Sequence, residues 1–358
     1  MTTLTRTGTA ATAQRHRRSP SVTITVMAGL LVLGVLAGAT AGQLEVTPTG
    51  VVGSVLDRVG IATSWRPEPI LGDALWFIRF PRIAMCVVVG AALAVAGAVM
   101  QAVFGNPLAE PGVVGVSAGA ALGAAIAIAA GMTFAGGWAV AVMAFVGGLA
   151  ATLFVYATAR REGRTEVVTL LLTGIAVNAF AGAGLALVLF AGDTASREQI
   201  VFWQLGSMNG SRWPEVVIVA VVVLGGAAFA VLAARQYDLL ALGERSAAHL
   251  GVRVERLRIA SVVVVALLTG AAVAFVGIVA FVGLVVPHVV RMLLGPAHTT
   301  LIVGSAVAGA VLLVWADVLA RTIVAGADLP IGLLTSAVGG PFFLHLVRRA
   351  RSRAGGWA

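Results

Sequence analysis

The side chains in this sequence that could do chemistry are a few charged residues set between long apolar runs. Arg79 and Arg82 stand three residues apart where an apolar run begins, and Arg321 follows Asp317 by four residues. A guanidinium can bind a carboxylate through two parallel hydrogen bonds, so these arginines suit the recognition of an acidic partner. Two simpler interpretations stay open: contact of Arg79 and Arg82 with lipid headgroups, and an internal Asp317–Arg321 ion pair.

Catalysis by the chain itself is not indicated. None of its 24 basic residues is lysine, whereas a P-loop needs a lysine on the nucleotide phosphates. The sequence has no HExxH or CxxC motif, and its single cysteine, Cys86, can form neither an internal disulfide nor a thiolate metal cluster. We therefore expect a protein that is not an enzyme, with no intrinsic cofactor and no metal site.

The composition is that of an integral membrane protein. Hydrophobic residues make up 59% of the chain and charged residues only 11%, with a mean hydropathy of +1.00, against about 25% charged residues in an ordinary soluble domain. The apolar segments do not alternate with polar residues as barrel strands would, so they predict helices. The net charge of +9 fits cytoplasmic arginines and gives no reason to expect a nucleic acid. The predicted fold is an all-α, polytopic membrane protein.

About ten spanning helices are predicted, each needing roughly 20 apolar residues. They fall at residues 22–41, 83–104, 113–130, 138–157, 167–190, 216–234, 259–277, 283–294, 300–321 and 331–347, with loops at 42–78 and 193–215. Arginines gather before the first span, between spans four and five and spans six and seven, and after the tenth, which predicts that both termini are cytoplasmic. The predicted parts are an N-terminal arm (1–20), a membrane domain (21–350) and a tail (351–358).

The segment 239–258 separates spans six and seven on the predicted cytoplasmic side. A short helix is predicted at 240–250, and a helix of this length is marginal alone in water, so we expect it to pack against a partner. Its glycines would set the turns, and its apolar residues would seat in the partner. The residues expected in this contact are Leu242, Gly243, Glu244, Ala247, Leu250 and Gly251.

Two other blocks interrupt the apolar runs. GNPLAEPG (105–112) contains two prolines and cannot form a continuous helix, so it predicts a tight hairpin, or else a gate or partner contact. In FVGLVVPHVVR (281–291), His288 and Arg291 share a helix face, and a structural role for the histidine is favoured over metal ligation. Each polar residue near the spans could simply bond a neighbouring helix. As candidates for a pathway or gate we take Asn106, Pro107, Asn178, Pro287, His288, Arg291, Thr335 and Ser336, with Thr169 and Thr173 as further possibilities.

Five blocks in order carry a resemblance to a known family. They are RFPRIAMCVVVGAALAVAGAVMQ (79–101), NPLAEPGVVGVSAGA (106–120), LALGERSAAHLGV (240–252), FVGLVVPHVVRMLLG (281–295) and LPIGLLTSAVGGPFF (329–343). Over about residues 70–350 the chain resembles the FecCD-type permeases, the membrane subunits of bacterial ABC importers for iron chelates, haem and vitamin B12. The resemblance implies a bacterial inner-membrane protein that acts as a homodimer, although a heterodimer with a paralogue stays open.

The resemblance also implies partners and a cargo. A separate cytoplasmic ATPase dimer would hydrolyse ATP and dock on 239–258, and an extracytoplasmic solute-binding protein would dock on Arg79, Arg82 and Arg321. The expected cargo is an iron chelate, either haem or a ferric siderophore, with vitamin B12 as the alternative. A secondary transporter without an ATPase is the competing class. It is disfavoured because acidic residues within the spans, apart from Asp317, are scarce.

Overall fold

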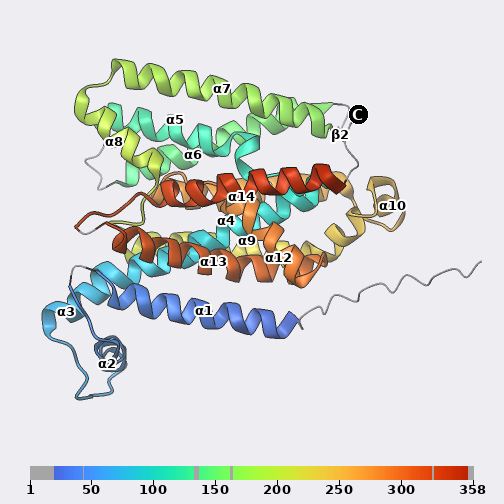
Figure 1. The fold of residues 1–358 in the computed structure, drawn as a ribbon. Coiled ribbons are helices and arrows are strands. Elements are labelled where there is room, and N and C mark those ends of the chain that lie inside the picture. The colour runs from blue at the N-terminus through green and yellow to red at the C-terminus, as the bar shows by residue number, and fades with distance from the viewer. Residues whose placement is uncertain (1–19, 43, 133–136, 162–163, 325, 354–358) are drawn as a thin grey trace, which may run out of the picture.

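The structure of the protein, a computed structural model, describes residues 20–353 apart from 43, 133–136, 162–163 and 325 (Figure 1). The predicted arm, apart from residue 20, and residues 354–358 of the predicted tail lie outside this part of the chain. The helices are α1 (Pro20–Thr40), α2 (Pro48–Arg58), α3 (Pro69–Ala74), α4 (Phe80–Phe104), α5 (Val116–Ala129), α6 (Trp138–Thr158), α7 (Val167–Ala191), α8 (Thr194–Leu205), α9 (Trp213–Leu240), α10 (Glu244–His249), α11 (Val254–Val276), α12 (Val282–Leu294), α13 (His298–Thr322) and α14 (Ile331–Arg353). A π-helical turn (Leu75–Arg79), a 3-10 helix (Pro111–Val114) and a small hairpin of β1 (Arg160–Arg161) and β2 (Arg164–Thr165) complete the described elements.

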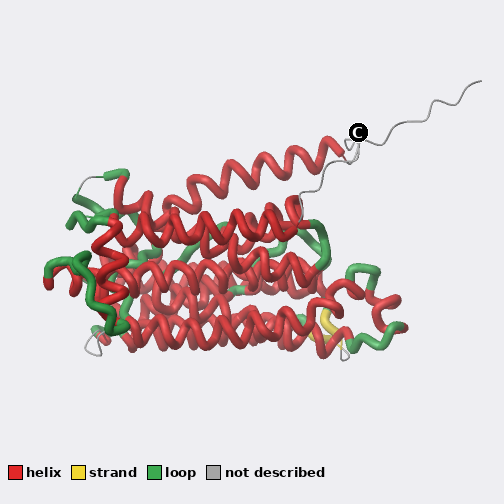
Figure 2. The backbone as a smooth tube through the Cα atoms, turned by 90° about the horizontal axis from the view of Figure 1, so that it is seen from below, coloured by secondary structure: helices red, strands yellow, loops and turns green. Residues whose placement is uncertain are grey.

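The long helices run side by side along one direction, as Figure 2 shows. Within the described residues, seven helices are long and apolar enough to cross a membrane, and three shorter apolar helices lie among them (Val116–Ala129, Val282–Leu294 and Ile331–His345). The all-α, polytopic membrane fold is therefore confirmed, whereas the count of ten spans stays a prediction. One end of the bundle carries α10, the hairpin, the first residues of α1 and the last residues of α14 (Figure 1). The other end carries α2, α3 and α8.

The core of the bundle forms around α4, most of whose side chains are buried. Small residues let its backbone touch those of its neighbours. A Cβ atom at Gly90 would lie 2.2 Å from the carbonyl oxygen of Gly309 in α13, and one at Gly97 would overlap the carbonyl of Gly283 in α12. Close glycine contacts of this kind replace side-chain interdigitation between membrane helices. Because Gly90 and Gly97 are seven residues apart, they lie on the same face of α4, and α13 and α12 pack against that face at different heights.

The predicted loops at 42–78 and 193–215 are partly helical, and the loop prediction is wrong there. The first contains α2 and α3, and the second contains α8, which Asp193 caps by accepting a hydrogen bond from the Ser196 amide. That bond holds the pKa of Asp193 below its usual value. These helices escape a search for long apolar runs because they are short and carry polar residues, so their hydropathy resembles that of loops.

The predicted start of the second span at residue 83 is also wrong. The chain is helical from Pro69 through Phe104, so Pro81 lies within a continuous helical run. The π-helical turn explains how the run passes the proline: the Phe80 amide bonds Leu75, five residues back, which shifts the hydrogen-bond pattern directly before Pro81. Turns of this kind are rare and commonly mark functional sites.

Candidate functional site

The segment between α9 and α11 projects from one end of the bundle as α10 (Figure 1). It is shorter than predicted, because α9 extends to Leu240, α11 begins at Val254, and α10 itself covers only Glu244–His249 rather than 240–250. Gly243 and Gly251 have φ angles of +103° and +87°, a region that favours glycine. They form the turns on either side of α10.

Two of the predicted contact residues, which flank α10, face outward, and one within α10 faces inward. The side chains of Leu242 and Leu250 are 65% and 59% exposed, whereas Ala247 is fully buried. Exposed leucines on a projecting segment are suited to a partner's apolar groove. Ala247 packs against its own chain, so in this structure a partner would meet the two leucines and not the alanine.

Glu244 is held by an internal ion pair that sequence reasoning missed. Arg258 of α11 is 3% exposed, and its Nη2 donates to Glu244 Oε1 at 2.5 Å. The other terminal nitrogen of Arg258 donates to the carbonyl of Thr165 in the hairpin, and Glu255 accepts bonds from Thr165 Oγ1 at 2.6 Å and from Tyr156 of α6 at 2.7 Å. The network joins α10 to α6, α11 and the hairpin. The i,i+3 spacing of Glu255 and Arg258 was the only sequence signal for it.

The opposite end of the bundle gathers the three predicted docking arginines. Arg82 is 6% exposed, and its Nε donates to Asp317 Oδ1 at 2.8 Å while Nη1 donates to Asp328 Oδ2 at 2.6 Å. Arg321 places Nε 3.1 Å from Asp317 Oδ2, so the internal pair that the spacing allowed is present. Its terminal nitrogens donate to two carbonyls at the end of α1, those of Gly38 and Ala41.

Among the residues that the structure describes, Arg79 has no acidic partner and bonds backbone carbonyls instead. Its guanidinium donates to the carbonyls of Ala39, Thr40 and Leu44, where the chain leaves α1. Together with Arg82 and Arg321 it lines a cavity of about 440 Å³. Each of the three arginines therefore already has partners within this chain, and docking of a binding protein on them stays a prediction.

The GNPLAEPG block turns back into the bundle. Its 3-10 helix places Pro111 against Gly283, which also lies beside the carbonyl of Leu93 near the middle of α4. Asn106 closes the turn by accepting a hydrogen bond from the Leu108 amide at 2.9 Å, and both Asn106 and Pro107 are exposed. The connection is thus deeper than a hairpin at the surface, and it carries Glu110 towards the centre of the molecule.

The remaining pathway candidates do not come together in one site. Asn178 of α7 donates to the carbonyl of Gly112 at 3.3 Å. Arg291 of α12 donates to Gln101 of α4 at 2.8 Å, and the Nδ1 atom of His288 is buried without a hydrogen-bond partner. Of the other candidates, Pro287 is buried inside α12, and Thr335 and Ser336 belong to α14. Thr169 and Thr173 are partly buried residues of α7.

Residues 115–119 read GVSAG, which matches the GxSxG order of serine hydrolases. That motif requires a strand–turn–helix and a neighbouring base. Ser117 instead lies in the first turn of α5, directly after the 3-10 helix, and no histidine lines the cavity that it faces. The match is therefore no sign of a nucleophile.

The structure is that of a multi-span membrane protein, a helix bundle with a projecting, leucine-bearing segment at one end and buried ion pairs at the other. The chain belongs to the FecCD transport family, whose model matches residues 29–349. It is 38% identical to the hemin transport system permease of Yersinia pestis over 95% of this chain and 99% of that protein. It is 42% identical to the cobalamin import system permease of Halobacterium salinarum over 77% of this chain and 74% of the relative.

A solved structure has the same fold. An ABC transporter of the metal-chelate type in an inward-facing conformation superposes with a TM-score of 0.81 and 27% identity, over 92% of this chain and all of that one. The family and the structure agree that this chain is an ABC-importer permease that spans a membrane. The relatives differ in what they carry, so the cargo does not follow from the family.

Proposed function

We propose that the chain is the translocating subunit of a binding-protein-dependent ABC importer in a bacterial inner membrane, and that it carries an iron chelate, haem or a ferric siderophore, into the cytoplasm. The observation that carries this proposal is the hemin permease relative, which matches over almost the full length of both chains. Vitamin B12 is the alternative cargo, because the cobalamin permease relative is slightly more identical over a shorter stretch.

A separate ATPase is proposed to bind the projecting segment. The exposed side chains of Leu242 and Leu250, which flank α10, supply the apolar contact. The ion pair between Glu244 and Arg258 would transmit a displacement of α10 directly to α11. An extracytoplasmic binding protein is proposed to dock at the other end. ATP-driven closure of the ATPase would then tilt the helices between two arrangements.

Uptake measurements test the cargo and the energy source together. The permease gene is deleted and replaced on a plasmid, and the uptake of haem, a ferric siderophore and cyanocobalamin is compared. Restoration of haem or siderophore uptake is expected, with a complete loss when the neighbouring ATPase is absent. Restoration of cyanocobalamin uptake alone would select the vitamin, and uptake without any ATPase would select a secondary transporter.

The homodimer is proposed to form along α7. In the single chain this helix exposes large apolar side chains, among them Leu172, Ile175 and Phe180. A twofold axis places equivalent residues of the two subunits opposite each other. A single cysteine introduced near the axis can therefore form a disulfide with the same cysteine of the other subunit. Cys86 is fully buried and should not react.

Disulfide cross-linking in membranes tests the dimer. Cysteines introduced one at a time at the three α7 positions are expected to give a cross-linked dimer at one or more of them. The matched control is Leu232→Cys on α9, which is 82% exposed and should stay monomeric. A cross-link at Leu232 but at none of the α7 positions would place the interface elsewhere.

A further inference from the structure

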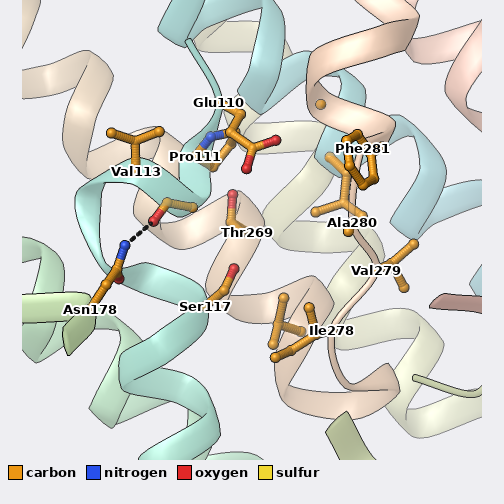
Figure 3. A pocket seen from close by; sticks show the side chains of 14 residues that line it. Glu110, Pro111, Val113, Ser117, Asn178, Thr269, Ile278, Val279, Ala280 and Phe281 are labelled. Atoms are coloured by element: carbon orange, nitrogen blue, oxygen red, sulfur yellow. Dashed lines mark hydrogen bonds between the residues drawn. The ribbon is translucent and has the colours of Figure 1, made fainter. Parts of the chain in front are cut away.

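A cavity of about 250 Å³ lies among α4, α5, α7 and α11, and four polar side chains stand in its mostly apolar lining (Figure 3). Leu93 and Asn178 line it from near the middles of α4 and α7, so the cavity lies at about the middle depth of the spanning helices. Glu110, Ser117 and Thr269 also line it. A charged side chain at this depth is costly and points to a function.

Three residues that line this cavity have side-chain oxygens without a hydrogen-bond partner among the described residues. Thr269 is 2% exposed, and its Oγ1 accepts and donates no hydrogen bond. The Oδ1 atom of Asn178 is buried and unpartnered as well, although the other side of the amide is bonded to Gly112. Within the described part of the chain, the Glu110 carboxylate makes no ion pair and no hydrogen bond. Unpaired buried oxygens cost about 1–3 kcal/mol each, so a missing ligand is expected.

The backbone beside the cavity is unwound. The helix α11 ends at Val276, α12 begins at Val282, and residues 278–280 line the cavity between them. Phe281 has a φ of +66°, the single positive value at a residue other than glycine in the described ranges. Strain of this kind costs about 1–3 kcal/mol and persists where surrounding structure holds it. The C-terminal end of α11 also brings the negative end of its dipole to the cavity.

We propose that this cavity binds one hydrated monovalent metal cation, with the Glu110 carboxylate, Thr269 Oγ1 and Asn178 Oδ1 as its protein ligands. All three are oxygens, which suit hard cations such as sodium or potassium rather than soft metals. A single carboxylate neutralises a single positive charge. Broken membrane helices with unwound carbonyls are a recurring setting for such ions.

A proton and a divalent ion fit the cavity less well. Protonation would neutralise Glu110 and give it one O–H donor, which could satisfy at most one of the two unpartnered oxygens, Thr269 Oγ1 and Asn178 Oδ1. A divalent cation would keep one uncompensated positive charge, and the described residues contain no group of three or more His, Cys, Asp or Glu side chains that could hold a metal. The cavity is also larger than a bare ion, and a water molecule takes about 30 Å³, so the remaining space suits coordinating water.

Thermal unfolding of the purified full-length protein in detergent tests the proposal. The midpoint is measured in NaCl, KCl and N-methylglucamine chloride at equal ionic strength and constant pH. Sodium or potassium is expected to raise Tm saturably by roughly 3 °C over N-methylglucamine. Binding of radioactive sodium, or of rubidium as a tracer for potassium, should reach one ion per chain.

The isosteric variants Glu110→Gln and Thr269→Val are expected to lose both the Tm shift and the bound ion. The matched control is Thr152→Val, a buried threonine that bonds its own helix at Gly148 and should keep both. A wild-type Tm that depends on pH but not on the cation would overturn the proposal in favour of a proton site. Retention of the cation response in both site variants would place the ion elsewhere. The cation response of the wild-type protein is measured without any variant. The test therefore remains decisive if a variant fails to fold.

Discussion

Replacing Glu244 with arginine is expected to lower ATP-driven uptake at least tenfold while ATP hydrolysis by the assembled transporter continues. Glu244 holds Arg258 at 2.5 Å, and Arg258 is a buried residue of α11 that also bonds the hairpin. A second arginine at position 244 would repel Arg258 and break the connection between α10 and α11. Breaking a buried ion pair costs about 3–5 kcal/mol. The side chain of Glu244 is 61% exposed, so we expect the loss of this pair to cost less, about 1.5 kcal/mol. An equal increase in the barrier to transport would slow uptake roughly tenfold.

The measurement uses proteoliposomes that contain the permease and its ATPase, with uptake and phosphate release followed in the same preparation. Glu244→Gln and Arg245→Gln form the matched pair, because each removes one charge from the same turn of α10 and only the first removes the internal ion pair with Arg258. We expect reduced uptake per ATP for the first and a much smaller effect for the second. Equal effects would mean that the charge of α10, and not the Arg258 connection, is what matters.

A different result would point to the partner surface. If Glu244→Arg prevents the ATPase from co-purifying with the permease, the glutamate contacts the ATPase directly, as its sequence position predicted. Leu242→Ser provides the comparison, since this leucine is exposed and outside the internal network. It should weaken co-purification without changing the uptake obtained per ATP by the complexes that remain.

The spanning helices were the most predictable part of the fold. The predicted spans 259–277, 283–294 and 300–321 match α11, α12 and α13 to within five residues at every end. Two of these helices end at a glycine: Gly277 follows α11 and Gly295 follows α12, both with positive φ angles. Hydropathy and glycine together locate a helix that crosses a membrane. They say nothing about short polar helices outside it, which is why α2, α3 and α8 were missed.

The contacts that make the sites were much less predictable. Arg82 and Asp317 lie 235 residues apart in sequence, and no local pattern connects them. The GNPLAEPG block, which carries Glu110, was predicted to form a tight hairpin because its two prolines rule out a continuous helix. Only the packing of Pro111 against Gly283 shows that this block returns to the depth of Leu93 in α4. The depth of a short block in the membrane depends on tertiary packing, so it cannot be predicted from the hydropathy of the block alone.

Replacing Asp317 with asparagine is expected to produce the largest loss of stability among the charged residues. Asp317 is 2% exposed and lies between Arg82 Nε at 2.8 Å and Arg321 Nε at 3.1 Å. The change removes one buried negative charge and leaves two buried guanidiniums with only Asp328 near one of them. The loss expected on breaking a buried pair is about 3 kcal/mol or more. It should appear as a Tm lower by several degrees and as a smaller monodisperse fraction in detergent.

Asp328→Asn is the matched control, because Asp328 bonds the same arginine but its side chain is 37% exposed. Its expected loss is about 1 kcal/mol or less. The comparison also separates two roles for the arginines. If they serve mainly to stabilise the bundle, Asp317→Asn lowers stability and leaves the affinity of the folded fraction for a binding protein almost unchanged. If they are held ready for an acidic partner, removing Asp317 frees two guanidiniums, and binding-protein affinity should rise at unchanged Tm. That second outcome would contradict the stabilising role inferred from the buried geometry.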